Sequence, residues 1–470
     1  MITVLDLVIV GIYLVFIMYI GIHASKKVTN DDDFFTAQRS FGPLVLLATV
    51  CATTLGGSAV MGRAGLGYTN GIECLVTALP YTIGMLIFSA YSGRIHDVGV
   101  KYNISTIPGL FGYRFGNASK IVISIMIAFA MMGTVASQIT VTGSIIKLLG
   151  AEVEISYEVG AIIATVVFIA YTSSSGLFGV VYTDVIQFFM LVAFVYIMVP
   201  VSSISTIGGL GRFISNIDTS YLIPHVDGRI LGDIVSYLVI TMAGAEMWQR
   251  AFVAKDRKAA KKGLFLGTIS YAICMVLVLV MALAAQQLLP NIKEMYGSTD
   301  VVIPALATTF LPAGLSGLTL AGILSVLMST ADSYLLVSVQ TVVSDIGKTT
   351  FPALDSKTTL RLSRVLTVVL ASSALVIALY IKSAYSILTM IYNFYAAAAG
   401  IPAFAALYWK KATAQGMIAA NIGGFAVCAA WKALGNPFGL GGTLPGALVC
   451  LILLVTVSLA TYKKNPSRMV

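Results

Sequence analysis

Apolar stretches of about 20 residues recur from one end of the chain to the other, and each is long enough to cross a membrane as a helix. A helix bonds its backbone polar groups within one segment, which the hydrocarbon interior of a bilayer demands. Because 58% of the 470 residues are hydrophobic and only 10% are charged, a soluble domain is excluded. We therefore predict an all-α polytopic membrane protein with a single domain, 1–470, whose surroundings are a lipid bilayer.

The predicted spans number about thirteen, and their boundaries are uncertain by several residues. They cover approximately 3–23, 43–69, 72–92, 119–148, 157–173, 181–204, 229–251, 263–288, 304–343, 360–381, 384–409, 413–433 and 443–462.

The distribution of basic residues predicts how these spans are oriented. With the N-terminus outside, 22 of the 29 Lys and Arg residues fall in inner connections and 6 in outer ones, and Arg63 is left inside a span. Positive charge is enriched on the cytoplasmic side, so we predict an N-out, C-in protein of the plasma (inner) membrane. The basic run from Arg250 to Lys262 is then a loop at the membrane surface, and nucleic acid is not an expected partner.

One predicted span, 43–69, contains a polar segment with two glycines, Ala52–Ser58. A helix that breaks at this depth exposes backbone carbonyl groups, which is tolerated only where they face protein, water or a bound ion. The segment therefore predicts an ion or solute site inside the membrane.

Seven sequence motifs along the chain resemble those of the sodium:solute symporter family. In order they are Asp32–Gly42, Ala52–Leu55, Thr106–Gly116, Gly179–Gln187, Gln249–Arg250, Met328–Ser333 and Tyr408–Gly416. Each is weak alone, but together they extend over nearly the whole chain in the order of the family.

This resemblance implies the LeuT-type fold, in which two inverted repeats of five helices form the core. The repeats would cover 43–204 and 229–409, with the first helix and residues 413–470 peripheral. Inverted repeats predict a second broken helix at the position that corresponds to the first. Met242–Ala245 is the expected break.

The resemblance also implies a sodium site between the first broken helix and the span 304–343. Its ligands would be the main-chain carbonyls of Ala52, Leu55 and Val326 and the hydroxyls of Ser329 and Thr330. Hard cations prefer such oxygen ligands, and Na+ would be the coupling ion. In the alternative interpretation, the two hydroxyls bond only to their own helix, as serine and threonine often do in membrane helices.

Asp332 and Ser333 predict a second cation site or a proton site. Relatives with a second sodium carry hydroxyls at these two positions, whereas this chain has a carboxylate and a hydroxyl. A carboxylate at this depth is costly and is by default a functional candidate. The alternative is an ion pair between Asp332 and Arg63, which we discount because Arg63 lies toward the outside of the proposed sodium site and Asp332 toward the inside.

Asp184 matches the acidic residue that the family places on the sodium exit route. At the cytoplasmic start of the span 181–204 it could equally be a helix-terminal aspartate that the N-terminal dipole stabilises. Both interpretations remain open from the sequence.

The expected solute pocket lies at the two breaks and is lined by Gly56, Gly57, Ser58 and Gly244. We place no tryptophan beside either break, which makes a tryptophan cage improbable, although tyrosines could partly replace it. Such a pocket, lined by glycine and poor in aromatic residues, predicts a small solute. Arg63 could pair with a solute carboxylate, or it could be a snorkelling or helix-anchoring arginine near the outer vestibule. We expect Glu246 to be a gate residue, or a residue that supports the solute ligands from behind, that pairs with a nearby cation, rather than a solute ligand.

These features predict sodium-coupled symport of a small organic solute, such as an amino acid, small carboxylate or vitamin-like compound, into the cell by alternating access. Proton coupling through Asp332 is the alternative, and a channel is a more remote one. An enzyme is not expected, because His23, His96 and His225 lie near helix ends or in loops, and no HExxH or GxSxG motif occurs.

Overall fold

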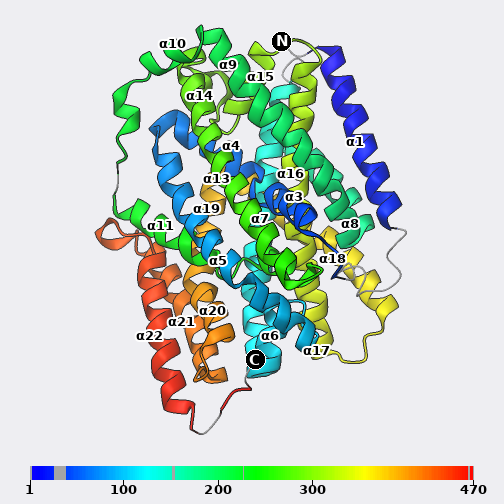
Figure 1. The fold of residues 1–470 in the computed structure, drawn as a ribbon, viewed down its shortest axis with the longest axis vertical. Coiled ribbons are helices and arrows are strands. Elements are labelled where there is room, and N and C mark those ends of the chain that lie inside the picture. Colours follow the sequence, from blue (N-terminus) through cyan, green and yellow to red (C-terminus); the bar gives the residue numbers. More distant parts are fainter. Residues whose placement is uncertain (1–2, 26–38, 151–153, 226, 464–465, 469–470) are drawn as a thin grey trace.

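A computed structural model describes residues 3–25, 39–150, 154–225, 227–463 and 466–468. Helices make up nearly all of these ranges, and the only β-type pairing within them is an isolated bridge between Phe41 and Ala254. Figure 1 shows the helices packed side by side into one bundle, with the two chain ends at opposite ends of the molecule. Residues 32–38 of the expected family motif Asp32–Gly42 lie outside the described residues.

The first half of the chain forms α1 (Val4–Ser25), α3 (Pro43–Thr54), α4 (Gly57–Asn70), α5 (Glu73–Tyr102), α6 (Ile107–Phe115), α7 (Asn117–Leu149), α8 (Tyr157–Met190) and α9 (Val199–Ile207). A π-helical segment, Leu191–Met198, joins α8 to α9. α8 contains Gly176 in the left-handed region with φ of 55°, which kinks the helix. The kink lies between the predicted spans 157–173 and 181–204.

The second half forms α10 (Leu210–Ser215), α11 (Gly228–Ile240), α12 (Ala245–Val253), α13 (Arg257–Leu288), α14 (Ile292–Tyr296), α15 (Val302–Phe310), α16 (Leu315–Gln340), α17 (Lys348–Thr350), α18 (Ser356–Tyr380), α19 (Ala384–Tyr395), α20 (Ile401–Tyr408), α21 (Ala414–Ala433) and α22 (Thr443–Thr461). π-Helical segments follow α16 at Thr341–Gly347 and α19 at Ala396–Gly400.

The all-helical membrane architecture is confirmed. Within the described ranges, 11 helices are long and apolar enough to cross a membrane, and the pair Pro43–Thr54 and Ala59–Asn70 could form one more span with a bend of 52°. Tyr157–Ala170 is apolar but shorter. The count of thirteen spans and their orientation stay predictions.

Two predicted boundaries are wrong. The span 304–343 is two helices, α15 and α16, because Pro312 and a left-handed Gly314 interrupt it. The basic loop 250–262 is also absent. Arg250 belongs to α12, and α13 begins at Arg257, so the surface connection between these helices is only Ala254–Asp256. The Asp256 carboxylate caps α13 by accepting from the Ala259 amide, and this bond lowers the pKa of Asp256.

α16 is the most deeply enclosed helix of the bundle. The whole apolar window of its span is buried, and it packs against α1, α3, α7, α8 and α12. α1 lies at one edge of the bundle and α21 and α22 at another (Figure 1). Asp6 of α1 accepts hydrogen bonds from the amides of Gly314 and Gly317, at 2.8 and 2.7 Å. It thereby provides acceptors for amides at the N-terminus of α16 that have no partner within the helix. Any ion that reaches the middle of α16 is therefore shielded from lipid.

Candidate functional site

The structure brings α3 and α16 together through a cluster of oxygen atoms. The carbonyl of Ala52 accepts from the hydroxyls of Ser329 at 2.8 Å and Thr330 at 3.3 Å. Thr330 also donates to the Thr53 carbonyl at 3.3 Å, and Ser329 to the Val326 carbonyl at 3.1 Å. Four of the five predicted sodium ligands are therefore linked by a chain of hydrogen bonds, from Thr330 through Ala52 and Ser329 to Val326.

The fifth predicted ligand, Leu55, stands at the break itself. Its amide still bonds to the carbonyl of Cys51, while the next residue, Gly56, is already outside both helices. The alternative, that these hydroxyls bond to their own helix, holds for Ser329 with the Val326 carbonyl, but both hydroxyls also reach the carbonyl of Ala52 on α3. Hydroxyl and carbonyl oxygens without formal charge are ligands that suit a hard cation.

The break between α3 and α4 is supported by close packing. The freed amide of Gly57 donates to the side-chain oxygen of Gln138 on α7 at 2.8 Å. A β-carbon on Gly56 would stand 2.6 Å from Thr330 Oγ1, and one on Gly57 would overlap Leu327. The approach of α16 thus leaves no room for a side chain at either glycine, and their predicted place in the solute pocket stays a prediction. The side chain of Ser58 lies outside the described residues.

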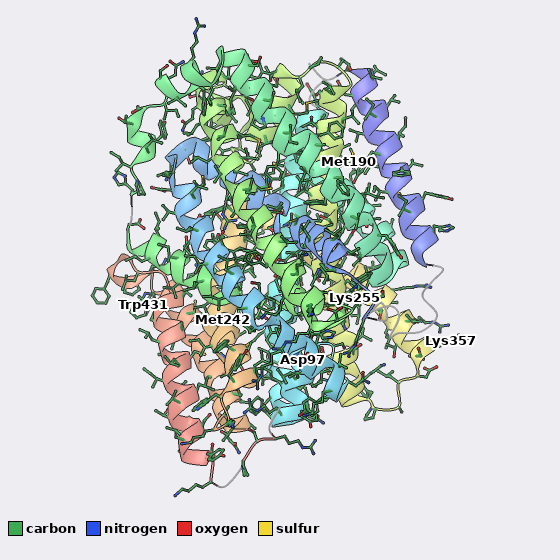
Figure 2. The ribbon with its side chains drawn as sticks, viewed as in Figure 1. Asp97, Met190, Met242, Lys255, Lys357 and Trp431 are labelled. Carbon is green, nitrogen blue, oxygen red and sulfur yellow. The ribbon has the colours of Figure 1, made fainter. Side chains whose placement is uncertain are left out.

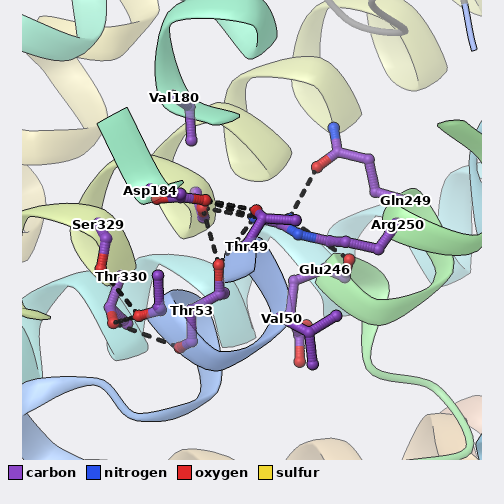
Figure 3. A network of polar contacts seen from close by, with 12 residues as sticks. Thr49, Val50, Thr53, Val180, Asp184, Glu246, Gln249, Arg250, Ser329 and Thr330 are labelled. Carbon is purple, nitrogen blue, oxygen red and sulfur yellow. Dashed lines mark hydrogen bonds and ion pairs between the residues drawn. The ribbon is translucent and has the colours of Figure 1, made fainter. Parts of the chain in front are cut away.

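Arg250 lies at the centre of a second polar cluster beside this one, buried with 1% of its surface exposed. Its Nη2 donates to Ser333 at 2.7 Å, to Thr53 at 2.8 Å and to Thr49 at 3.2 Å, and lies 3.6 Å from the Asp184 carboxylate. Figure 3 shows this network spanning α3, α8 and α12. One guanidinium group therefore joins four helices, α3, α8, α12 and α16.

Sequence reasoning missed this role because it assigned Arg250 to a cytoplasmic loop, which the structure corrects. Of the predicted inner basic residues, 21 then remain against 6 outer ones, so the charge bias persists. The sequence did contain a signal for the buried position of Arg250. Asp184 is a second charged residue in an apolar region, and because buried charges are normally paired, it calls for a buried cation.

Asp184 lies inside α8 and not at a helix start, so the interpretation as a dipole-stabilised terminal aspartate is wrong. Its Oδ2 accepts a short hydrogen bond from the Thr49 hydroxyl and faces Arg250, whereas its Oδ1 is buried without a hydrogen-bond partner. An unpaired carboxylate oxygen next to the inner end of α3 suits transient contact with a passing cation.

Asp332 and Ser333 point to different neighbours. Asp332 accepts from the hydroxyl of Thr172 on α8 at 2.6 Å, and its second carboxylate oxygen is buried without a hydrogen-bond partner. Ser333 instead contacts Arg250 and Thr53 on the α3 side. Adjacent helical positions diverge by about 100°, and the two side chains therefore do not form one ligand pair here.

The break between α11 and α12 occurs where the repeat predicts it, at 241–244 (Met242 in Figure 2). Two carbonyls freed by the break receive side-chain donors. The Trp248 indole bonds to the Met242 carbonyl at 2.9 Å, and the Tyr395 hydroxyl bonds to the Ala243 carbonyl at 2.6 Å. A tryptophan thus does contact this break, contrary to our expectation, and it stabilises the broken backbone.

A small pocket lies beside the second break. Gly244, Glu246 and four tyrosines line it: Tyr81, Tyr334, Tyr392 and Tyr395. The expectation of a pocket poor in aromatic residues is wrong, because these tyrosines come from three helices that lie far apart in the sequence. Glu246 is 4% exposed and forms no ion pair in the described part of the chain.

Arg63 of α4 is buried away from any carboxylate among the described residues. Its Nη1 donates to the Tyr271 hydroxyl at 2.8 Å, and its guanidinium lies 4.8 Å from the centre of the Tyr237 ring. No ion pair with Asp332 exists in the described structure, as we expected. Arg63 is 3% exposed, which does not suit a snorkelling role, whereas its bond to Tyr271 of α13 fits the helix-anchoring alternative.

The bundle of membrane-spanning helices contains two broken helices, and backbone carbonyls of one of them meet hydroxyls of α16. This arrangement defines a secondary transporter that couples ion binding to solute movement, and not an enzyme. The family model of the sodium:solute symporter family matches residues 34–424, and the chain belongs to that family.

Curated relatives and solved structures agree with this assignment. The osmoregulated proline transporter OpuE of Bacillus subtilis (strain 168) is 26% identical over 97% of this chain and 95% of its own length. The sodium/pantothenate symporter of Haemophilus influenzae is 26% identical over 87% of each chain.

Among solved structures, a Na+-coupled sialic acid symporter in a substrate-bound outward-open state superposes with a TM-score of 0.83 over 100% of this chain and 99% of its own, at 17% identity. Mhp1, a nucleobase-cation-symport-1 family transporter in a closed conformation, gives 0.63 over 92% and 95%, at 14% identity. These likenesses show the LeuT-type fold.

Proposed function

We propose that this protein imports a small organic solute together with Na+ across the plasma membrane by alternating access, with its N-terminus outside. Sodium-coupled solute symport is the activity of the family to which the chain belongs. In our proposal the repeats are 43–204 and 229–409, since each begins with a broken helix, and residues 413–470 stay peripheral.

The observation that carries the proposal is the meeting of Ala52 with Ser329 and Thr330 across α3 and α16. A sodium ion held by these atoms and by the carbonyls of Leu55 and Val326 would tie α3 to α16. The ion would then favour the arrangement in which the two helices stay together. Solute that also prefers this arrangement binds more tightly when sodium is present, which is thermodynamic coupling between two sites.

Release to the inside requires that α3 separate from α16. In our proposal the Arg250 network is the second link between these helices, and it lies inward of the sodium ligands. Asp184 faces this link with an unpartnered oxygen and would receive sodium as it leaves. The inward membrane potential helps this step, by about 2.3 kcal/mol for one charge per 100 mV.

Proton coupling through Asp332 is the second candidate function. It is favoured by the buried Asp332 oxygen that has no hydrogen-bond partner, since a proton could occupy it without rearrangement of the helices. A second sodium at Asp332 and Ser333 would instead need Ser333 to exchange its contact with Arg250 for a contact with the ion.

The solute class is supported by the relatives named above, one for proline and one for pantothenate, which are both small and both carry a carboxylate. We infer a solute of similar size for this chain.

Uptake by purified protein in liposomes tests the proposal. Inward gradients of sodium, potassium or protons would be imposed in turn, with proline and pantothenate as the first labelled probes and a panel of amino acids, carboxylates and vitamins after them. Accumulation that needs the sodium gradient and saturates supports sodium symport. Accumulation driven by the proton gradient alone supports the second candidate, and flux that never saturates indicates a channel.

A further inference from the structure

The pocket beside the second break has only one charged side chain in its lining. Glu246 belongs to the first turn of α12, and its Oε2 is buried without a hydrogen-bond partner. A β-carbon on Gly244 would stand 3.0 Å from the other carboxylate oxygen, so a glycine there leaves room for this side chain. The carboxylate is therefore built into the pocket wall and not directed toward lipid.

Neither buried arginine forms an ion pair with Glu246 in the described part of the chain. Arg250 Nη1 bonds to the main-chain carbonyl of Glu246 at 3.4 Å, and the carboxylate that faces the Arg250 guanidinium belongs to Asp184. Arg63 is occupied by the Tyr271 hydroxyl and the Tyr237 ring. The Glu246 carboxylate therefore has the Tyr334 hydroxyl and the charge of Arg250 nearby, but its Oε2 has no hydrogen-bond partner and no described cation lies within ion-pair distance.

Four tyrosine rings form much of the remaining lining of the pocket, together with Met131, Ile240 and Thr241. Tyr81 lies 5.2 Å from Tyr271 and 6.5 Å from Tyr237, and Tyr237 lies 5.8 Å from Tyr392, measured between ring centres. Aromatic faces attract cations, and a site with one carboxylate and several tyrosines is complementary to a positive charge on a small apolar body.

We propose that the transported solute carries a protonated amine, and that Glu246 is the residue that recognises it. The ammonium group of the solute would donate to Glu246 while its carbon atoms contact the tyrosines. The assignment rests on the symport function proposed above, and it narrows the solute to amines and amino acids. The pocket has a free volume of about 10 Å³, the space of one water molecule, so the tyrosines must move apart when the solute enters.

A second explanation for Glu246 is stabilisation of the α12 N-terminus, where a negative charge is favourable. That role needs only a carboxylate in the first turn, and it does not explain an acidic side chain among four pocket tyrosines. It also predicts that a neutral substitution alters stability and leaves solute selectivity unchanged, which separates the two explanations.

The test measures thermal stabilisation of the purified full-length protein in sodium chloride and in potassium chloride. Probes come in pairs of equal size, with and without the amine: L-alanine with L-lactate, L-leucine with L-2-hydroxyisocaproate, and L-proline with tetrahydrofuran-2-carboxylate. Pantothenate serves as a probe that has no amine. We expect stabilisation by at least one amine and none by its partner compound.

Glu246→Gln should weaken binding of that amine by about 10- to 100-fold, the range for a hydrogen bond to a charged group. Glu246→Asp, which keeps the charge, should retain part of the affinity. Glu73→Gln is the matched control, because Glu73 is buried but bonds to Asn70 and to the backbone of His225 outside the pocket. The control should bind like the wild type.

Equal binding of both members of a pair, binding of pantothenate alone, no binding of any amine, or wild-type affinity in Glu246→Gln would each overturn the proposal. The comparison of probes on the wild type decides even where a variant does not fold. Failure of the symport function has a different signature, in which no probe, pantothenate included, shows sodium-dependent uptake.

Discussion

The guanidinium of Arg250 donates a 2.7 Å hydrogen bond to the hydroxyl of Ser333, one turn of α16 after Ser329. A positive charge that is part of the protein thus occupies the neighbourhood where the sequence predicted a second cation. The same guanidinium lies 3.6 Å from Asp184, so α8, α12 and α16 meet at one buried ion pair. If these helices separate, either the Arg250–Asp184 ion pair breaks or α8 and α12 move together.

The first prediction concerns the stability of that pair. Arg250→Met should lower the apparent free energy of unfolding by about 3–5 kcal/mol, because it leaves the Asp184 carboxylate buried without its cation. The measurement is thermal unfolding of the purified protein in detergent. Arg250→Met combined with Asp184→Asn should recover part of the loss, since no lone charge then remains. If the double variant is no more stable than Arg250→Met alone, the ion pair does not couple the two residues.

The second prediction concerns the main sodium site. Ser329→Ala or Thr330→Ala each removes one hydroxyl from the cluster around the Ala52 carbonyl. Loss of about 1 kcal/mol of binding free energy would raise the sodium concentration for half-maximal uptake about fivefold. Thr319→Ala is the control, since that hydroxyl bonds near the outer end of α16. Unchanged sodium dependence in both site variants, beside a normal control, would refute the assignment.

The third prediction uses the glycines at the break. Gly56→Ala places a β-carbon 2.6 Å from Thr330 Oγ1, so Thr330 must shift and the sodium requirement should rise. Gly57→Ala would overlap Leu327 and crowd Gln138, so it should lower protein yield and stability more than sodium affinity. Gly11→Ala has no atom within 4 Å of the added carbon and should behave like the wild type. Sodium-dependent uptake and thermal unfolding of the three variants distinguish these effects.

The sequence predicted backbone features of this site better than its side-chain partners. Glycines in an apolar span and the repeat of a known family were enough to place both breaks, because chain geometry there depends on local residues. Arg250 was misplaced because a charge near the end of a span fits either a loop or a buried ion pair. The decision depends on Asp184, which is 66 positions away in the chain and next to it only in the fold.

The pocket was mispredicted for the same reason. Tyr81, Tyr334 and Tyr392 belong to α5, α16 and α19, and no local pattern indicates that their side chains meet at Glu246. The glycines of the first break were assigned to solute space because glycine creates room. In the folded chain that room is filled by Thr330 and Leu327.

The last prediction turns on Asp332, whose carboxylate holds Thr172 with one oxygen and leaves the other without a partner. Asp332→Asn keeps the size and can still accept from Thr172, but it removes the negative charge. If Asp332 binds a second sodium, the variant should transport fewer sodium ions per solute, or bind sodium more weakly, with modest change in pH dependence. If Asp332 carries a proton, the wild type should move protons with the solute and the variant should not.

Solute-coupled sodium and proton fluxes, measured in liposomes for wild type and Asp332→Asn side by side, decide between these roles. Thr172→Val is a useful companion, because it removes the hydroxyl donor and leaves the carboxylate in place. A cation or proton role predicts that Thr172→Val alters the affinity at this site while the stoichiometry stays that of the wild type. Identical fluxes in wild type and Asp332→Asn would instead assign Asp332 a structural role, holding α16 to α8 through Thr172.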